Sequence, residues 1–307
     1  MACLSTILLV SIVRQKIFVG AVYKDYQKDG NDWTEKTCNA ENNPTVSPIN
    51  INTNTAICTS DYLMDIYFFA TDERPFRLGF VGQPKTLKTR FAVDMFDMFV
   101  RFADGSYTKY RAKDLVVRVP SEHTIDRKRA PAEQQYTFVV DRLYKVFGSP
   151  PEIQLSIMNT LVQNKTRHGF FSKLIQKLEA TPIDKMLLAS EITPIKYYTS
   201  GPSSLNTYYQ RPIKFWMYNG TSTDGDCSKK IIRIIIKQPR ELSFHELDFY
   251  HSYLKNLTGY ENNARQVINP NNIAVHSCGS NCENLIWEFI QFVAIYAAIL
   301  YFTFAIN

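Results

Sequence analysis

One segment, PSEHTIDRKRAPAEQQYTFVV at residues 120–140, carries the side-chain types found around a protein metal site. Glu122, His123 and Glu133 supply two carboxylates and an imidazole. A strand holds a metal through donors at positions i and i+2, because alternate side chains point to the same face. None of the five histidines (His123, His168, His245, His251 and His276) has another histidine two residues away. The segment therefore has the frame of a metal site without its expected ligands.

The cysteines form a second candidate cluster. The chain has six, and Cys278 and Cys282 flank a short GSN stretch. A pair at this spacing binds a metal or closes a small disulfide, but a zinc-finger pattern needs a second such pair nearby. Cys3, Cys38, Cys58 and Cys227 are too widely spaced to supply it. The spacing therefore does not favour a structural metal site.

The elements that must position these residues are mainly strands. Between residues 23 and 277, short apolar or alternating runs such as MDIYFFA, FDMFVRF, KDLVVRV, YTFVVDRL, IKFWMY and KKIIRIIIK are divided by turn residues. A hairpin is expected at 101–107, through ADGS. Helical spacing is limited to 169–180 and 243–257, and Ser243 with Glu246 predicts a capping box. The expected fold class is mostly β (α+β), with one large twisted mixed sheet and short peripheral helices.

Two apolar segments flank this domain. Residues 1–22 begin with MACLSTILLVSIV and predict a signal-like segment or an uncleaved anchor. Residues 285–306 predict a transmembrane helix, since about 22 residues reach roughly 33 Å. A buried core helix would show a polar stripe, whereas 292–306 has Thr303 as its polar residue. The expected organisation is an N-terminal segment (1–22), one domain (23–277) and a membrane helix (285–306).

The charge pattern argues against nucleic acid as a partner. The net charge of +6 is spread along the chain, and basic clusters such as 127–129 are separated by acids and apolar residues. Grooves that bind single-stranded nucleic acid interleave basic with aromatic side chains. No such pattern is present, so we expect no nucleic-acid partner.

Several blocks together resemble the α-class carbonic anhydrases. They are YKDYQKDGNDW (23–33), VSPINI (46–51), the region 104–140 with SEHTID, FWMYNGTSTDGDC (215–227), IIRIIIKQP (231–239) and NNARQVINPNN (262–272). They follow the family's order over nearly all of 23–277. The resemblance implies the family's large central β-sheet and, in active members, a zinc ion held by three histidines in an open tetrahedral site. That zinc lowers the pKa of a bound water to about 7 for CO₂ hydration.

The resemblance places the zinc-ligand positions on residues that do not bind zinc. Alignment on SEH puts the first two at Val116 and Arg118, and alignment on Glu133 puts the third at Gln135. Valine has no donor atom, an amide is a poor zinc ligand, and a guanidinium stays protonated. We therefore expect no zinc, no other cofactor and no catalysis, as in the family's non-catalytic relatives.

Part of the former site is expected to remain as scaffold. Glu122 and Thr223 match the pair that orients the zinc-bound hydroxide in the family, and Glu133 matches a supporting carboxylate. Arg118 lies on the strand face that once pointed at the metal. We expect its guanidinium to form a charge-assisted contact with Glu122 or Asp224.

The resemblance also pairs Cys38 with Cys227, as in extracellular family members. Such a disulfide implies an oxidising compartment and could contribute roughly 4–5 kcal/mol. Sequons occur at Asn164, Asn219 and Asn256. Asn219 lies in a block that the family packs beside its pocket, which argues against glycosylation there. This consideration favours the mitochondrial inner membrane, with the domain in the intermembrane space, over the cell surface.

These observations predict a non-catalytic, membrane-anchored protein that is a structural or accessory subunit of a larger membrane protein complex. A mitochondrial respiratory assembly is one candidate. The expected partners are the membrane and other protein subunits, without zinc. The alternative from another class is a cell-surface binding or adhesion module that uses the old pocket or its rim. A residual carbonate dehydratase, or an enzyme with a different metal, is the weaker alternative.

Overall fold

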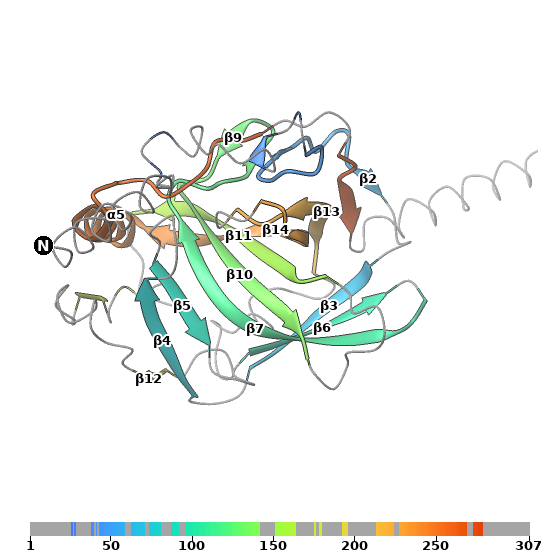
Figure 1. Cartoon of the computed structure of the whole chain (residues 1–307), viewed down its shortest axis with the longest axis horizontal. Coiled ribbons are helices and arrows are strands. Elements are labelled where there is room, and N and C mark those ends of the chain that lie inside the picture. Colours follow the sequence, from blue (N-terminus) through green and yellow to red (C-terminus); the bar gives the residue numbers. More distant parts are fainter. Residues whose placement is uncertain are drawn as a thin grey trace, which may run out of the picture.

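One large β-sheet makes up most of the part of the chain that the structure describes (Figure 1). The computed structural model of the chain describes residues 26, 28, 38–39, 41, 43–58, 63–70, 74–80, 87–91, 96–102, 104–141, 151–163, 175, 178–179, 192–195, 213–223, 227–268 and 273–278. Twelve strands in this part of the chain form the main sheet, in the order β12-β4-β5-β7-β10-β11-β14-β13-β15-β2, with β6 also beside β7 and β3 beside β6. The mostly β fold class predicted from the strand pattern is confirmed.

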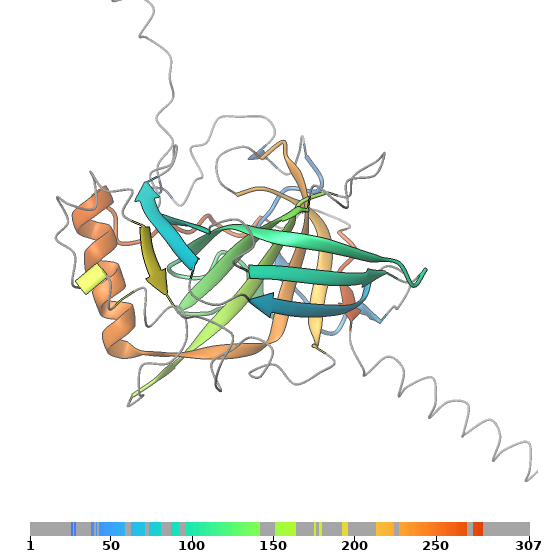
Figure 2. The same ribbon diagram turned by 90° about the horizontal axis from the view of Figure 1, so that it is seen from below.

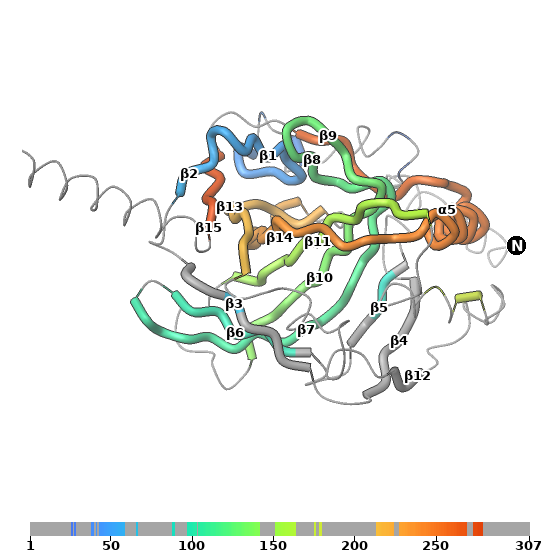
Figure 3. Tube along the Cα trace, turned by 180° about the vertical axis from the view of Figure 1, so that it is seen from behind, coloured from blue at the N-terminus to red at the C-terminus, as the bar shows by residue number. Residues whose placement is uncertain are grey.

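The strands of the main sheet are mostly antiparallel. Their bounds are β2 Ile57–Cys58, β3 Leu63–Ala70, β4 Arg74–Phe80, β5 Leu87–Phe91, β6 Phe96–Phe102, β7 Tyr107–Arg118, β10 Ala132–Val140, β11 Ile153–Val162, β12 Ile192–Ile195, β13 Phe215–Thr221, β14 Lys230–Ser243 and β15 His276–Cys278. β11 runs parallel to β14, and β15 runs parallel to β2, so the sheet is mixed as predicted. A view from behind shows β7, β10, β11 and β14 side by side at its centre (Figure 3).

The predicted hairpin joins β6 to β7. Arg101 pairs with Tyr107, and Gly105 takes a positive φ of 82° in the turn. A side chain at this φ would be strained, which explains a glycine here. A separate small sheet joins β1 (Asn50–Ile51) to β8 (Thr124–Ile125) and β9 (Lys128–Arg129).

The two faces of the central strands differ in chemistry. On β7, Leu115 and Val117 belong to the main apolar core, as do Val119 just after the strand and alternate residues of β10, β11 and β14. Residues between them point to the other face, because side chains alternate along a strand. That second face is polar yet buried, with Asp114, Arg118 and their neighbours on the adjoining strands. A buried polar face needs internal partners, and these partners form the site described below.

The predicted capping box is present in helix α5 (Phe244–Thr258). The Ser243 side chain accepts from the backbone of Glu246, and the Glu246 side chain accepts from the backbone of Ser243. The helix ends at Gly259 with a left-handed φ of 82°. It lies across one end of the main sheet (Figure 2), where Tyr250 and Leu254 join the apolar core. In the other predicted helix, Ile175, Leu178 and Glu179 are helical.

The predicted N-terminal segment (1–22) and transmembrane helix (285–306) lie outside the described residues. Within the described part of the chain, no helix is long and apolar enough to cross a membrane.

Candidate functional site

The structure brings the three expected ligand positions together on the buried polar face. Val116 and Arg118 are alternate residues of β7. On β10, Gln135 pairs directly with Val116, and Glu133 pairs with Arg118. Directly opposed residues of an antiparallel pair share a face, so all four side chains lie on the same side of the sheet. Each is at most 1% exposed.

Arg118 lies at the centre of this cluster and is fully buried. Its Nε donates to Gln135 Oε1 at 3.2 Å, and its Nη1 donates to Tyr26 Oη at 2.6 Å and to the Asn263 carbonyl at 3.0 Å. The Nε also lies 3.4 Å from Glu122 Oε1. The expected contact of Arg118 with a carboxylate is therefore present, with Glu122 as the partner. Asp224, the other candidate, lies outside the described residues.

Glu122 is held from several directions at once. Its Oε2 accepts from Thr223 Oγ1 at 2.6 Å and from Gln135 Nε2 at 2.9 Å. Its Oε1 accepts from the backbone N–H of Arg265 at 3.3 Å and faces Arg118. A buried carboxylate is tolerated when it is paired and its oxygens are hydrogen-bonded, and both conditions hold here.

Glu133 fixes the neighbouring loop. Its Oε2 accepts from the backbone N–H groups of Glu122 at 2.9 Å and His123 at 3.0 Å. His123 Nδ1 lies 2.8 Å from Glu133 Oε1, and Nε2 lies 2.7 Å from Tyr218 Oη, which in turn donates to Ser47 Oγ. Burial alone would raise the pKa of Glu133, but the attraction of His123 and the hydrogen bonds hold this pKa well below its usual range. Both ring nitrogens of His123 are therefore occupied by structural hydrogen bonds to Glu133 and Tyr218.

The residues present do not fit a zinc ion. A catalytic zinc needs about three neutral or anionic donors that converge on one point. Val116 offers none, Arg118 places a positive charge there, and the Gln135 amide already bonds to Arg118, Glu122 and Glu133. Among the described residues, no group of three or more His, Cys, Asp or Glu side chains is placed to hold a metal ion.

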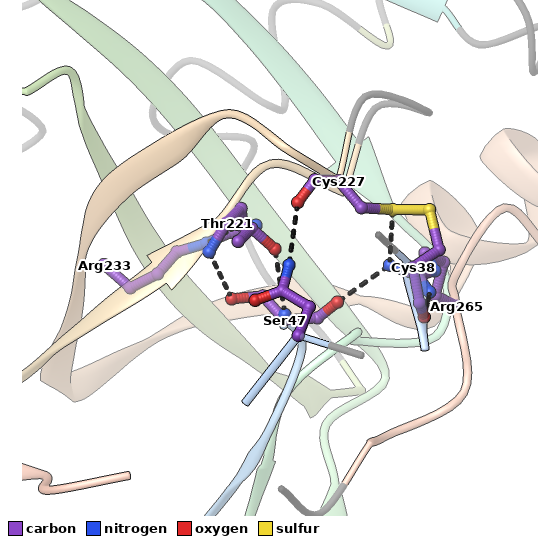
Figure 4. The surroundings of a disulfide bond; sticks show 7 residues. Cys38, Ser47, Thr221, Cys227, Arg233 and Arg265 are labelled. Carbon is purple, nitrogen blue, oxygen red and sulfur yellow. Dashed lines mark hydrogen bonds between the residues drawn. A yellow bond between two sulfur atoms is a disulfide. The ribbon is translucent and has the colours of Figure 1, made fainter. Parts of the chain in front are cut away.

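The expected disulfide joins Cys38 to Cys227, with a Cα–Cα distance of 5.1 Å (Figure 4). Arg265 contacts both cysteines, and its Nη1 lies 3.4 Å from Cys227 Sγ. Its Nη1 donates to the Ser47 carbonyl at 2.8 Å, and its Nη2 donates to the Cys38 carbonyl at 3.2 Å. The bond therefore anchors the N-terminal part of the domain beside the former metal site.

The remaining described cysteines differ in state. Cys58 is also disulfide-bonded. Cys278 is a buried thiol whose pKa burial raises to about 11, so little thiolate forms at neutral pH.

Sequence reasoning identified the right blocks but missed several side chains in them. Tyr26 and Asn263 bond directly to Arg118, and Arg265 bonds to Glu122 through its backbone. The Asn263 side chain also bridges the Val119 N–H and the Val117 carbonyl. These three residues lie in YKDYQKDGNDW and NNARQVINPNN, two of the blocks that resemble the family. Polar residues that are buried in such a block must have hydrogen-bond partners, and this could have identified them.

One sequence expectation is wrong. Asn219 is exposed, although it was expected to be packed beside the pocket. Phe215 and Met217, on the same face of β13, reach the apolar core, whereas Asn219 lies nearer the end of the strand and does not. Asn256 is exposed as well, and Asn164 lies outside the described residues. Because Asn219 is exposed, its sequon gives no argument against passage of the chain through the secretory pathway.

A large mixed sheet with an apolar core on one face and a buried polar centre on the other defines a carbonic-anhydrase-type fold. A family model for eukaryotic-type carbonic anhydrases matches residues 28–278, and the chain belongs to this family. A search of curated protein sequences finds no match.

Solved structures show the same fold at low identity. The halotolerant carbonic anhydrase of Dunaliella salina is 17% identical, with a TM-score of 0.61, over 84% of this chain and 98% of that one. Carbonic anhydrase Cah3 from Chlamydomonas reinhardtii, in complex with acetazolamide, is 18% identical, with a TM-score of 0.58, over 76% of this chain and 91% of that one. Dioscorin, complexed with ascorbate, is 17% identical, with a TM-score of 0.55, over 76% of this chain and 85% of that one.

Proposed function

We propose that this chain is a non-catalytic member of the carbonic anhydrase family that serves as a structural subunit of a membrane protein complex. One observation carries the non-catalytic part. The fully buried Arg118 guanidinium occupies a ligand position and is tied to Gln135, at a second ligand position, and to Glu122. A fixed positive charge in this place repels a metal cation, and it gives the retained carboxylate a structural partner.

The membrane and assembly parts of the proposal are supported by different features. The apolar segment 285–306 has the length and composition of a single-pass anchor. The disulfide between Cys38 and Cys227 supports an oxidising compartment, such as the mitochondrial intermembrane space. A domain without catalysis on a membrane anchor suits a subunit whose role is to hold its neighbours in place.

A second candidate is a cell-surface binding module, and the exposed Asn219 favours it. Its sequon lies in β13 with the side chain uncovered, so a glycan added there meets no packed neighbour. This candidate shares the fold and the disulfide with the first. The two differ in partner and compartment.

The purified full-length chain is expected to contain no stoichiometric zinc and to hydrate CO₂ no faster than buffer. Elemental analysis and stopped-flow hydration measure these two properties. The variant carrying Val116→His, Arg118→His and Gln135→His is the comparison, because it restores a donor set that zinc prefers. We expect this variant to take up zinc. One tightly held zinc per wild-type chain, with hydration that disappears on its removal, would show that the proposal is wrong.

Native purification from mild detergent tests the assembly. We expect the chain to migrate in a complex well above its 35.4 kDa mass, with other proteins in constant ratio by mass spectrometry. A chain that runs alone, reaches the cell surface and loses mass after Asn219→Gln would instead support the binding module. Asn256→Gln is the matched control for the second exposed sequon.

A further inference from the structure

The connection from β8 to β9 carries three consecutive basic residues, Arg127, Lys128 and Arg129, and all three are exposed. Within the part of the chain that the structure describes, none of these side chains forms an ion pair. The acidic residue beside them, Asp126, uses its carboxylate elsewhere. Its Oδ1 accepts from the Thr53 N–H at 2.9 Å, and its Oδ2 accepts from the Thr53 hydroxyl at 2.8 Å. This basic turn (126–129) therefore presents two guanidinium groups and an ammonium group to its surroundings.

The backbone of the basic turn is fixed. Asp126 and Arg127 have positive φ angles of 48° and 65°, which residues other than glycine rarely adopt. Two hydrogen bonds to β1 hold this conformation: the Asp126 N–H donates to the Ile51 carbonyl at 2.8 Å, and the Arg127 N–H donates to Asn50 Oδ1 at 2.7 Å. The basic side chains therefore extend from a defined position next to β1.

The basic turn lies close to β2 and β15. Thr53, which binds Asp126, is four residues before Ile57 of β2, so the two are at most roughly 14 Å apart. The Ile57 N–H donates to the Val275 carbonyl at 2.8 Å, and β2 pairs with β15. The turn and the two strands thus belong to one region of the surface.

A short tether joins this region to the proposed membrane anchor. β15 ends at Cys278, and six residues separate it from the apolar segment 285–306. A chain of this length reaches at most roughly 25 Å. β2 and β15 lie at one end of the main sheet and α5 lies at the other (Figures 1 and 2). The end with β2 and β15 is therefore the one held near the bilayer.

This end also carries side chains that are typical of membrane–water boundaries. Ile57 is 52% exposed. Trp216 of β13 is partly exposed and pairs with Ser277 of β15, and Lys237 Nζ lies 5.2 Å from the centre of the Trp216 ring. Tryptophan is enriched at the headgroup level, where its amphipathic ring contacts both phases.

We propose that the membrane-proximal face, formed by the basic turn, Ile57 and Trp216, rests on the headgroups of a bilayer that contains anionic phospholipid. Arg127 and Lys128 are placed to bind lipid phosphate groups, since guanidinium and ammonium groups form charge-assisted hydrogen bonds with phosphate. The short tether favours lipid over an acidic protein as the occupant, because it keeps this face near the bilayer with or without a neighbouring subunit. The contact depends on the anchor of the proposed function, and it directs α5 away from the membrane.

Nanodiscs that hold the full-length chain, made of phosphatidylcholine alone or with added phosphatidylglycerol, test the contact. Mass spectrometry measures the rate at which a water-soluble reagent acetylates Lys128, with Lys255 on α5 as the internal reference. We expect Lys128 to react at least about fivefold more slowly in the discs with phosphatidylglycerol, because one basic residue near an anionic surface contributes about that factor. High salt should abolish the difference, since it screens exposed charges. Lys255, which pairs with Glu261, should react equally in both discs.

Arg127→Gln removes one charge from the face and keeps the backbone bond to Asn50. In the anionic discs this variant should raise the Lys128 rate at least about twofold. Lys255→Gln, the matched loss of a charge at the other end of the sheet, should leave the Lys128 rate unchanged.

Three results would overturn the contact and leave the proposed function intact. They are equal Lys128 rates in the two kinds of disc, undiminished protection in Arg127→Gln, and protection that appears only in the native complex, which would indicate an acidic protein as the occupant. A chain that separates from the discs in density-gradient flotation would overturn the anchor and the contact together.

Discussion

Replacing Arg118 with alanine is expected to lower the free energy of unfolding by about 3–5 kcal/mol. The guanidinium is fully buried and donates to Gln135, Tyr26 and the Asn263 carbonyl. Its removal leaves three acceptors without this donor and Glu122 without its nearest cation. Each buried group that loses its partner costs free energy, and the vacated space adds a cavity term.

The pairing with Glu122 is separated from these other losses by a double-mutant cycle. Arg118→Ala combined with Glu122→Gln is expected to be more stable than Arg118→Ala alone, because the second change removes an uncompensated buried charge. Glutamine keeps the shape of the side chain and one acceptor for Thr223. Simply additive effects of the two substitutions would mean that the ion pair contributes nothing.

Arg118→Lys provides the conservative comparison. Lysine keeps the positive charge but lacks the planar fork that reaches Gln135, Tyr26 and Asn263 together. Urea unfolding should place this variant between the wild type and Arg118→Ala. Stability as low as that of alanine would mean that the hydrogen-bond geometry, not the charge, supports the site.

Cys227→Ser is expected to destabilise the oxidised protein by roughly 4–5 kcal/mol. The bond to Cys38 closes a loop with a sequence separation of 189 residues, and in the chain-entropy model a long loop gives a large stabilisation. Chemical unfolding with and without reductant measures the effect. In reductant, which also breaks the disulfide of Cys58, the wild type and the variant should have the same stability.

The matched control is Cys278→Ser, which replaces a buried thiol. The two substitutions share the cost of a buried hydroxyl in place of sulfur, so their difference reports the disulfide. Equal losses in both variants, or peptide maps of native protein with Cys38 and Cys227 reduced, would remove the argument for an oxidising compartment.

Local sequence patterns were sufficient to predict the strands, the hairpin at 101–107 and the capping box at Ser243, because each depends on residues close together in the chain. The Arg118–Glu122 contact could also be predicted, since these residues are four apart, at the end of β7 and just after it. The disulfide was predicted from the resemblance to the family alone. Each of these features could therefore be predicted either from neighbouring residues or from the resemblance to the family.

The remaining contacts depend on where distant segments meet. Tyr26 and Asn263 come from irregular stretches with no periodicity, so nothing local indicates that both reach Arg118. The exposure of Asn219 depends on how far the apolar core extends along β13, which is a property of tertiary packing.

The position of Arg118's partners along the chain constrains the order of events during biosynthesis. Tyr26 is 92 residues before it and Asn263 is 145 residues after it. Until the last of these has left the ribosome, Arg118 and Glu122 must remain hydrated, since burial without partners is costly. The apolar face of the central strands can collapse earlier, whereas the polar face must close last. Such non-local contacts make folding slow, so the polar face stays open after the apolar face has begun to pack.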